Sequence, residues 1–172
     1  ILNKDTEPEE MLDLIKLLDQ NKTIGIISEA GLPAVADPGA QLVKVAQQKR
    51  IQVVPLVGPS SILLALMASG MNGQNFAFHG YLPIDKTERN KKLAHLEAES
   101  AKTGIAQIFM ETPYRNNQMV DDLTKILRAE TKICVACHIT LEDEDIRTLS
   151  IKEWKNEKYD FHKRPAIFVM QA

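Results

Sequence analysis

Cysteine, aromatic residues and long apolar runs are all scarce in this sequence. Two cysteines among 172 residues argue against a disulfide framework. No apolar run approaches the roughly 20 residues of a membrane-spanning helix, and no signal-peptide pattern is visible, so we expect a cytoplasmic protein with no membrane partner. The net charge of −2 argues against a wholly basic nucleic-acid binder, so any contact with a polyanion must come from a local patch.

Two common phosphate-binding fingerprints are also absent. Neither G-x-G-x-x-G nor G-x-x-x-x-G-K-[ST] occurs in the sequence, so the usual loops that cradle the phosphates of dinucleotides and nucleoside triphosphates are missing. A site built around phosphate contacts is therefore disfavoured. This leaves a ligand held mainly by backbone groups and apolar walls.

Two loops rich in glycine and proline stand out against this background. One covers residues 28–39 and the other residues 57–61, and each lies between a short apolar run and a helical pattern. We predict buried parallel strands over residues 24–28 and 51–56, whose carboxyl ends form a ligand crevice in an open α/β sheet. A purely structural connection is the alternative, because Gly and Pro are common turn residues. We prefer the interpretation as a ligand site.

The rest of the chain alternates between helical and strand patterns. We predict helices containing residues 8–18, 42–46, 61–69, 87–99 and 117–128, a short helix opened by a capping box at 150–153, and strands over 105–110, 132–139, 146–149 and 166–170. A break over residues 76–86 is typical of a linker. It divides the chain into a partial N-terminal α/β lobe, residues 1–82, and a C-terminal α/β lobe, residues 83–172.

Cys134, Cys137 and His138 spell C-x-x-C-H, the pattern of a covalently attached haem. We reject this interpretation because the segment has the pattern of a buried strand, in which residues three apart point to opposite faces. No second ligand pair accompanies the cysteines, and the acidic run 142–145 lacks the spaced oxygen ligands of a calcium loop. We therefore expect buried unpaired cysteines, a solvated acidic loop and no metal.

Two further features have both a structural and a functional interpretation. The clearest basic cluster is either a solvated helix face or a phosphate-binding patch, and it consists of Lys86, Arg89, Lys91 and Lys92. Glu111 and Arg115 flank a turn forced by Pro113 at the end of a predicted strand. They form either a structural ion pair or part of the crevice.

Three motifs in this order resemble those of the tetrapyrrole methylase family of S-adenosylmethionine-dependent methyltransferases. The motifs are Ser28-Glu29-Ala30-Gly31-Leu32-Pro33 with Asp37-Pro38-Gly39, Val54-Pro55-Leu56-Val57-Gly58-Pro59-Ser60-Ser61, and Phe109-Met110-Glu111-Thr112-Pro113-Tyr114-Arg115. The resemblance extends over residues 24–170. It implies a two-lobed α/β fold with a parallel sheet in the first lobe and a mixed sheet in the second, the donor S-adenosylmethionine in the cleft between them, and a homodimer.

The resemblance also implies roles for individual residues. The implied donor-binding residues are Gly31, Leu32, Pro33, Val35, Ser60, Ser61, Met110, Glu111, Pro165 and Ala166. The nearest branch of the family methylates a ribose 2′-hydroxyl of small-subunit ribosomal RNA, and we expect the same reaction here. Its expected catalytic residues are Glu111 or His138 as a base and Arg115 as a phosphate contact, with the basic cluster holding RNA. The alternatives are a methylase of a tetrapyrrole or another small molecule, and a non-catalytic relative that kept the fold.

The sequence departs from the family at two places. The family's first strand and its Pro-Leu-Gly-Asn loop have no counterpart before Ile1, so we expect an N-terminally shortened chain. Residues 136–141 read Ala-Cys-His-Ile-Thr-Leu where the family has Ala-Arg-Glu-Leu-Thr-Lys. This replacement removes two cations and one acid from a segment next to the expected site.

Overall fold

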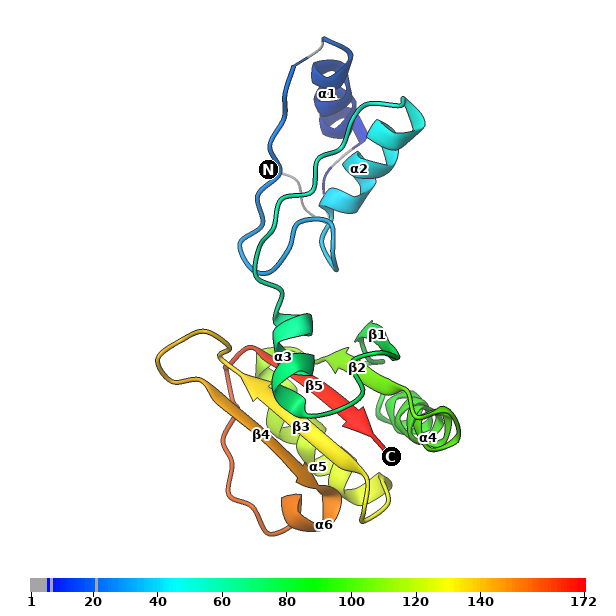
Figure 1. The fold of residues 1–172 in the computed structure, drawn as a ribbon, viewed down its shortest axis with the longest axis vertical. Helices are drawn as coiled ribbons and strands as arrows, with labels where there is room; N and C mark the ends of the chain where they lie inside the picture. The colour runs from blue at the N-terminus through cyan, green and yellow to red at the C-terminus, as the bar shows by residue number, and fades with distance from the viewer. Residues whose placement is uncertain (1–5, 7, 21) are drawn as a thin grey trace. The chain divides into compact units, whose positions relative to one another are not determined.

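The computed structural model describes residues 6, 8–20 and 22–172, which form two units, residues 1–60 and 61–172 (Figure 1). The first unit contains the helices α1 (Pro8–Asp19) and α2 (Gly39–Gln48), and α1 packs against α2. The helix α3 (Ser61–Ser69) belongs to the second unit. The predicted lobe boundary between residues 82 and 83 stays a prediction.

The helices of the first unit confirm the sequence pattern. Leu42 and Ala46 lie one turn apart on α2 and are buried, as expected for the apolar face of an amphipathic helix. The helix ends where Arg50 adopts a left-handed φ of 58° and Ile51 donates its backbone N–H to the carbonyl of Ala46.

The prediction of two strands in the first unit is wrong. In the described part of the chain, residues 24–28 and 51–56 have no strand structure. Their side chains are largely exposed, with Ile27 at 93% and Leu56 at 82%. A strand requires a neighbouring backbone to complete its hydrogen-bond ladder, and a local apolar pattern cannot supply that partner. The expected parallel sheet of the first lobe is therefore not observed.

The second unit is built on a mixed sheet. Its strands are β1 (Phe76–Tyr81), β2 (Ala106–Met110), β3 (Lys132–Cys137), β4 (Asp145–Ser150) and β5 (Ala166–Gln171). They lie in the order β1-β2-β5-β3-β4, with β1 parallel to β2 and the other pairs antiparallel. Their positions confirm the strands predicted after residue 100.

The prediction of a linker over residues 76–86 is also wrong, because residues 76–81 form strand β1. It pairs with β2 from Phe76 to Tyr81, with an irregularity between Phe78 and Tyr81 where Gly80 has a φ of 64°. The glycine that favours a linker in the sequence instead bends an edge strand. The α4 helix (Lys86–Thr103) then begins at Asp85, whose side chain accepts the N–H of Glu88.

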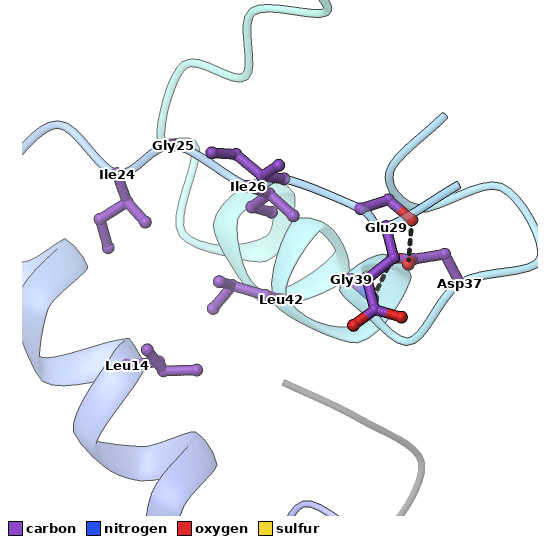
Figure 2. Close-up of a pocket in the computed structure, with 10 residues that line it drawn as sticks. Leu14, Ile24, Gly25, Ile26, Glu29, Asp37, Gly39 and Leu42 are labelled. Carbon is purple, nitrogen blue, oxygen red and sulfur yellow. Dashed lines mark hydrogen bonds between the residues drawn. The ribbon is translucent and has the colours of Figure 1, made fainter. Parts of the chain in front are cut away.

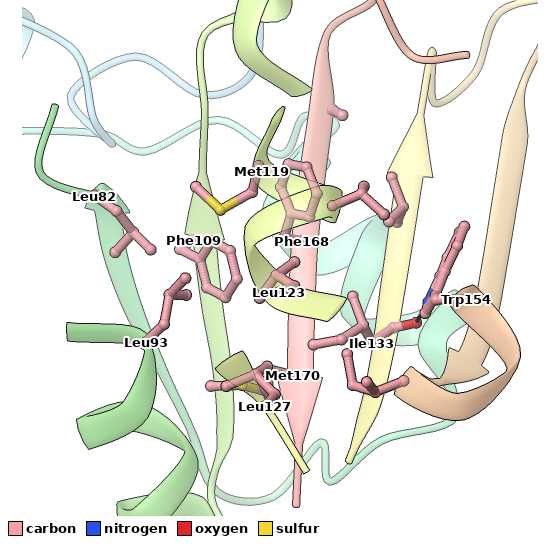
Figure 3. Packing of buried hydrophobic residues seen from close by; sticks show 14 of the residues in the cluster. Leu82, Leu93, Phe109, Met119, Leu123, Leu127, Ile133, Trp154, Phe168 and Met170 are labelled. Atoms are coloured by element: carbon pink, nitrogen blue, oxygen red, sulfur yellow. Dashed lines mark hydrogen bonds between the residues drawn. The ribbon is translucent and has the colours of Figure 1, made fainter. Parts of the chain in front are cut away.

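Helices cover both faces of this sheet (Figure 1), and each face has its own core. Figure 3 shows the core on the face covered by α4, α5 and α6. On one face, Leu93 of α4, Leu123 of α5 (Asn116–Ile126) and Trp154 of α6 (Ile151–Trp154) pack with the stacked rings of Phe109 and Phe168. On the other face, α3 packs against β3, β4 and β5. The predicted capping box between Ser150 and Glu153 is present at the start of α6.

Candidate functional site

The carboxylate of Asp37 organises the first predicted loop (Figure 2). Its Oδ1 accepts the backbone N–H groups of Ala34 at 3.0 Å and Gly39 at 2.8 Å, and its Oδ2 accepts the hydroxyl of Ser28 at 3.1 Å. The Ala34 hydrogen bond is the main cause that lowers the pKa of Asp37. A Cβ on Gly39 would lie 2.7 Å from Oδ1, so this arrangement requires glycine there.

Small residues give the first loop an open backbone. Gly31 has a φ of 68°, and no described atom lies within 4 Å of where its Cβ would be. Ala34 and Ala36 also adopt positive φ angles, of 66° and 53°, which is uncommon for residues other than glycine. A ligand can therefore approach the backbone of this loop without meeting bulky side chains.

The second predicted loop lies beside the first. A Cβ on Gly58 would be 3.2 Å from Cδ2 of Leu32, so the two loops meet at this point within the first unit. Ser60 is buried, and Ser61 begins α3. The two loops therefore lie next to each other at Leu32 and Gly58, and the single ligand site that they are expected to form stays a prediction.

A hollow of about 680 Å³ lies within the first unit, between the first loop and the helices α1 and α2 (Figure 2). Leu14, Ile24, Ile26 and Leu42 give it aliphatic walls, and Asp37 lies at its polar end. This combination of apolar walls and a few fixed polar groups is typical of small-molecule sites. Nothing in the sequence indicates this hollow, since its walls come from segments that resemble ordinary core.

In the second unit, strand register brings most of the predicted site residues to one end of the sheet, where β2 and β3 end and β5 begins. We call this end of the strands the sheet edge. Met110 at the end of β2 pairs with Ile167, and Cys137 at the end of β3 pairs with Ala166. The N–H of His138 donates to the carbonyl of Pro165 at 3.0 Å. Residues 110, 111, 138, 165 and 166 therefore lie at the same edge, although the sequence separates them by up to 56 positions.

Glu111 and Arg115 form an ion pair at this edge. Oε1 of Glu111 accepts Nη2 of Arg115 at 2.5 Å, Nε of Arg115 at 3.1 Å and the backbone N–H of Thr112 at 2.6 Å. The Glu111 side chain is only 1% exposed. These contacts favour the structural interpretation of the pair, because the carboxylate stabilises its own turn and holds the guanidinium in place.

His138 belongs to a second polar cluster at the same edge. Its Nδ1 lies 2.6 Å from Oδ2 of Asp143, and Nη2 of Arg164 donates to the Asp143 carbonyl at 2.5 Å. The hydrogen bond with His138 lowers the pKa of Asp143. The sequence analysis missed Asp143 and Arg164 as site candidates. Asp143 lies in an acidic run that predicts only a solvated loop, and Arg164 directly precedes two implied donor contacts.

The two cysteines behave as the strand pattern predicts. Both are free and fully buried, and their side chains belong to the cores on opposite faces of the sheet. Burial raises the pKa of both thiols. Among the described residues, no group of three or more His, Cys, Asp or Glu side chains is placed to hold a metal ion.

The basic cluster on α4 requires a correction at one position. Arg89 is buried and donates from Nε and Nη2 to Oδ2 of Asp122, at 3.2 and 2.7 Å, and from Nη1 to the carbonyl of Ile84 at 2.7 Å. It joins α4 to α5 and is not part of a surface patch. Lys86 and Lys91 remain exposed and Lys92 is partly exposed, with Lys91 paired to Glu88.

A mixed five-stranded sheet covered by helices on both faces defines the class as an α/β protein. Within that class, the chain belongs to the tetrapyrrole (corrin/porphyrin) methylase family, whose sequence model matches residues 3–155. This match confirms the resemblance carried by the three motifs. In the portions of the chain that the structure describes, no helix is long and apolar enough to cross a membrane.

Comparison with individual proteins agrees with the family. The chain is 33% identical over 152 residues to a protein of Vibrio cholerae named ribosomal RNA small subunit methyltransferase I, covering 88% of this chain and 51% of that protein. It therefore spans about half the length of that relative. Two solved structures share the fold. The methyltransferase CobJ has a TM-score of 0.63 at 14% identity, and the match covers 96% of this chain and 71% of that one.

The second solved structure is uroporphyrin-III C-methyl transferase from Thermus thermophilus in complex with S-adenyl homocysteine. It has a TM-score of 0.51 at 16% identity, and the match covers 95% of this chain and 73% of that one. The TM-scores show that the two structures share the fold of this chain. Identities of 14% and 16% say nothing of the methyl acceptor.

Proposed function

We propose that this protein is an S-adenosylmethionine-dependent methyltransferase that modifies a ribose 2′-hydroxyl of small-subunit ribosomal RNA. The observation that carries the proposal is the 33% identity to the Vibrio cholerae protein over most of this chain. We accordingly propose that the reaction takes place in the cytoplasm. The family resemblance further supports a homodimer, which sedimentation of the full chain tests.

The described loops suit the donor in chemical kind. In the first unit, the open backbone around Gly31 and the aliphatic side chains of Leu32 and Val35 offer polar edges beside apolar surface. In the second unit, Met110 and Ala166 place an apolar surface at the sheet edge. We propose these residues, with Pro33, Ser60, Ser61, Glu111 and Pro165, as the donor contacts.

Methyl transfer to a hydroxyl requires alignment and removal of one proton. S-adenosylmethionine, when bound, supplies a methyl group on a positively charged sulfur that leaves with the electron pair of the broken C–S bond. The chain then has to orient the hydroxyl oxygen and accept its proton. His138 suits the second task better than Glu111, because Glu111 is buried and its Oε1 accepts three hydrogen bonds.

Donor binding is tested by a matched pair of glycine variants. Gly31→Ala places a methyl group on the backbone that we propose the donor approaches. Gly104→Ala is the control, because Gly104 also has a positive φ, of 71°, with no described atom within 4 Å of its Cβ position. Both changes are expected to cost about 1 kcal/mol of stability.

Calorimetric titration of the full chain with S-adenosylhomocysteine is expected to show weaker binding only for Gly31→Ala. Equal affinity in both variants would contradict the assignment of the first loop. Methylation of small-subunit RNA by the full chain, against a tetrapyrrole as the competing acceptor, tests the acceptor class. Methylation of the tetrapyrrole alone would replace the proposed acceptor.

For the RNA contact, we propose Lys86, Lys91 and Lys92 without Arg89. Replacing the three lysines with glutamine is expected to reduce the salt dependence of RNA binding by a slope of about 0.7 for each phosphate that is no longer neutralised. Replacing Lys152, Lys155 and Lys158 in the same way is the control, since it changes the net charge equally. The same reduction in both variants would show a general charge effect in place of a patch.

A further inference from the structure

We propose that Asp143 is a positioning residue that holds His138 with its proton on Nδ1, leaving Nε2 to accept the proton of the methyl acceptor, and that Arg164 positions Asp143. The inference rests on the proposed function, because it concerns the proton removed from the acceptor hydroxyl. It assigns roles to an acidic side chain and an arginine that neither the sequence motifs nor the family match identifies.

The distance between His138 and Asp143 fixes where the proton lies. Nδ1 of His138 and Oδ2 of Asp143 are 2.6 Å apart. Two lone pairs repel at this distance, so a hydrogen must lie between the atoms, and the carboxylate can only accept it. His138 therefore carries its proton on Nδ1, and in the neutral ring the lone pair is on Nε2.

Arg164 serves Asp143 and does not compete for this nitrogen. Its Nε lies 3.3 Å from Nδ1 of His138, but it cannot donate to a nitrogen that already carries a proton. Its Nη2 donates to the carbonyl of Asp143 at 2.5 Å and reaches Oδ2 at 3.3 Å. The guanidinium thus holds both the backbone and the carboxylate of Asp143, whose side chain is otherwise 62% exposed.

The backbone around His138 is fixed in an uncommon conformation. His138 and Thr140 have φ angles of 49° and 72°, which are uncommon outside glycine and are strained for the β-branched Thr140. The His138 N–H bonds the carbonyl of Pro165, and the Thr140 N–H bonds Oε2 of Glu144 at 2.6 Å. These contacts hold the turn in which the histidine leaves the line of β3.

The remaining nitrogen is placed to react. Within the described residues, Nε2 of His138 has no hydrogen-bond partner, and the side chain is 18% exposed at the edge that also holds Met110 and Ala166. The acceptor oxygen uses a lone pair to form the new bond to the methyl carbon, the electron pair of the broken C–S bond stays on sulfur, and the hydroxyl proton moves to Nε2. The resulting imidazolium is stabilised by the Asp143 carboxylate.

The first test is the tautomer itself, measured on the full chain by ¹⁵N NMR of the imidazole rings. His138→Asn identifies the His138 signals among the four histidines, because asparagine tolerates the positive φ. The neutral ring of the wild type is expected to carry its proton on Nδ1. Asp143→Ala is expected to move the proton to Nε2, whereas Glu142→Ala, which removes a neighbouring exposed acid, is expected to leave it on Nδ1. A wild-type proton on Nε2 would overturn the inference.

The second test is the pH profile of RNA methylation. The charged groups next to His138 are Asp143 and Arg164. Glu144 accepts the N–H of Thr140, and Asp145 pairs with Cys137. Asp143→Ala is expected to lower kcat about 10-fold and His138→Asn about 100-fold. The KM for S-adenosylmethionine stays unchanged in both.

The loss of kcat in Asp143→Ala is expected at every pH at which the wild type is active, because a ring that carries its proton on Nε2 offers no lone pair there to the acceptor. The Glu142→Ala variant is expected to keep the wild-type profile. An active wild type whose Asp143→Ala variant matches Glu142→Ala would overturn the inference alone. A wild type that does not methylate RNA would overturn the proposed function, and with it this role of His138.

Discussion

At the scale of single residues, a few polar contacts shape each candidate site. Asp37 gathers two backbone N–H groups and one hydroxyl, which holds the first loop in conformations that small residues tolerate. At the turn after β3, the Asp143 carboxylate instead accepts from two side chains, through Nδ1 of His138 and Nη2 of Arg164. In both places the hydrogen bonds of one carboxylate hold a segment that has no regular backbone pairing.

Asp37→Asn is expected to destabilise the first unit by about 1 kcal/mol at neutral pH, because Asn cannot accept from both Ser28 and the two backbone groups. The folded state lowers the Asp37 pKa below its ordinary value of 3.8. The stabilisation is therefore complete above that value and disappears as the pH falls through the lowered pKa. Hydrogen exchange of the α2 amides measures the effect. A difference from the wild type that does not decrease as the pH falls below 3.8 would contradict it.

The buried thiols of Cys134 and Cys137 are expected to resist thiol reagents in the folded protein and to react fully after denaturation, since burial raises both pKa values. Glu142→Cys places a thiol in the exposed loop and serves as the reactive control. Elemental analysis of the purified protein is expected to find no stoichiometric zinc or iron. Rapid labelling of the native wild type, or one bound metal that Cys137→Ser removes, would show these expectations to be wrong.

At the scale of elements, the joint between α4 and α5 depends on an ion pair that the sequence presents as surface charge. Arg89 and Asp122 have side chains that are 6% and 1% exposed. Gln118 donates to the second oxygen of Asp122 at 3.0 Å. Such a pair contributes mainly when it is complete, because either partner alone is a buried charge without compensation.

Arg89→Ala is expected to reduce the free energy of unfolding by about 3 to 5 kcal/mol. Lys91→Ala removes an exposed i,i+3 pair with Glu88 and is expected to change it by less than about 0.5 kcal/mol. Urea unfolding followed by the fluorescence of Trp154, the single tryptophan, measures both. Replacing Arg89 and Asp122 together with apolar residues is expected to restore much of the stability. If Arg89→Ala and Lys91→Ala have the same stability, Arg89 is a surface residue and the ion pair with Asp122 does not stabilise the joint.

At the scale of the molecule, the described chain divides its stabilising contacts unevenly. The second unit contains the complete five-stranded sheet and the cores on both of its faces. The first unit has a helix pair and two irregular apolar segments, with Val54 at 64% and Val57 fully exposed. Most of the paired backbone groups of the strands and most of the buried apolar side chains therefore belong to the second unit.

Residues 61–172 expressed alone are expected to fold cooperatively, because every described strand and both cores lie within this range. Trp154 is buried and donates from Nε1 to the carbonyl of Ile133 at 3.0 Å, so its emission reports native packing. A single sigmoidal urea transition with blue-shifted native emission is expected. Solvent-exposed emission in the absence of urea would contradict independent folding.

The sequence by itself determined the helices, the strands after residue 100, the capping box and the family. These features depend on periodicity, caps and motif spacing, all of which are local. It also predicted that Cys134 and Cys137 lie on opposite faces, because strand alternation requires it. The tertiary structure decided what depends on distant partners.

Residues 24–28 and 51–56 have the composition of strands, but in the described chain they have no neighbouring backbone with which to pair. The sequence did not predict β1, because Gly80 is more typical of a loop than of a strand. Arg89 is buried because Asp122, 33 positions away, lies opposite it. The pairing of Asp143 with His138 and Arg164 likewise depends on where β3 ends beside the start of β5. Contacts of this kind are set by chain folding, which brings together residues whose local sequences carry no sign of one another.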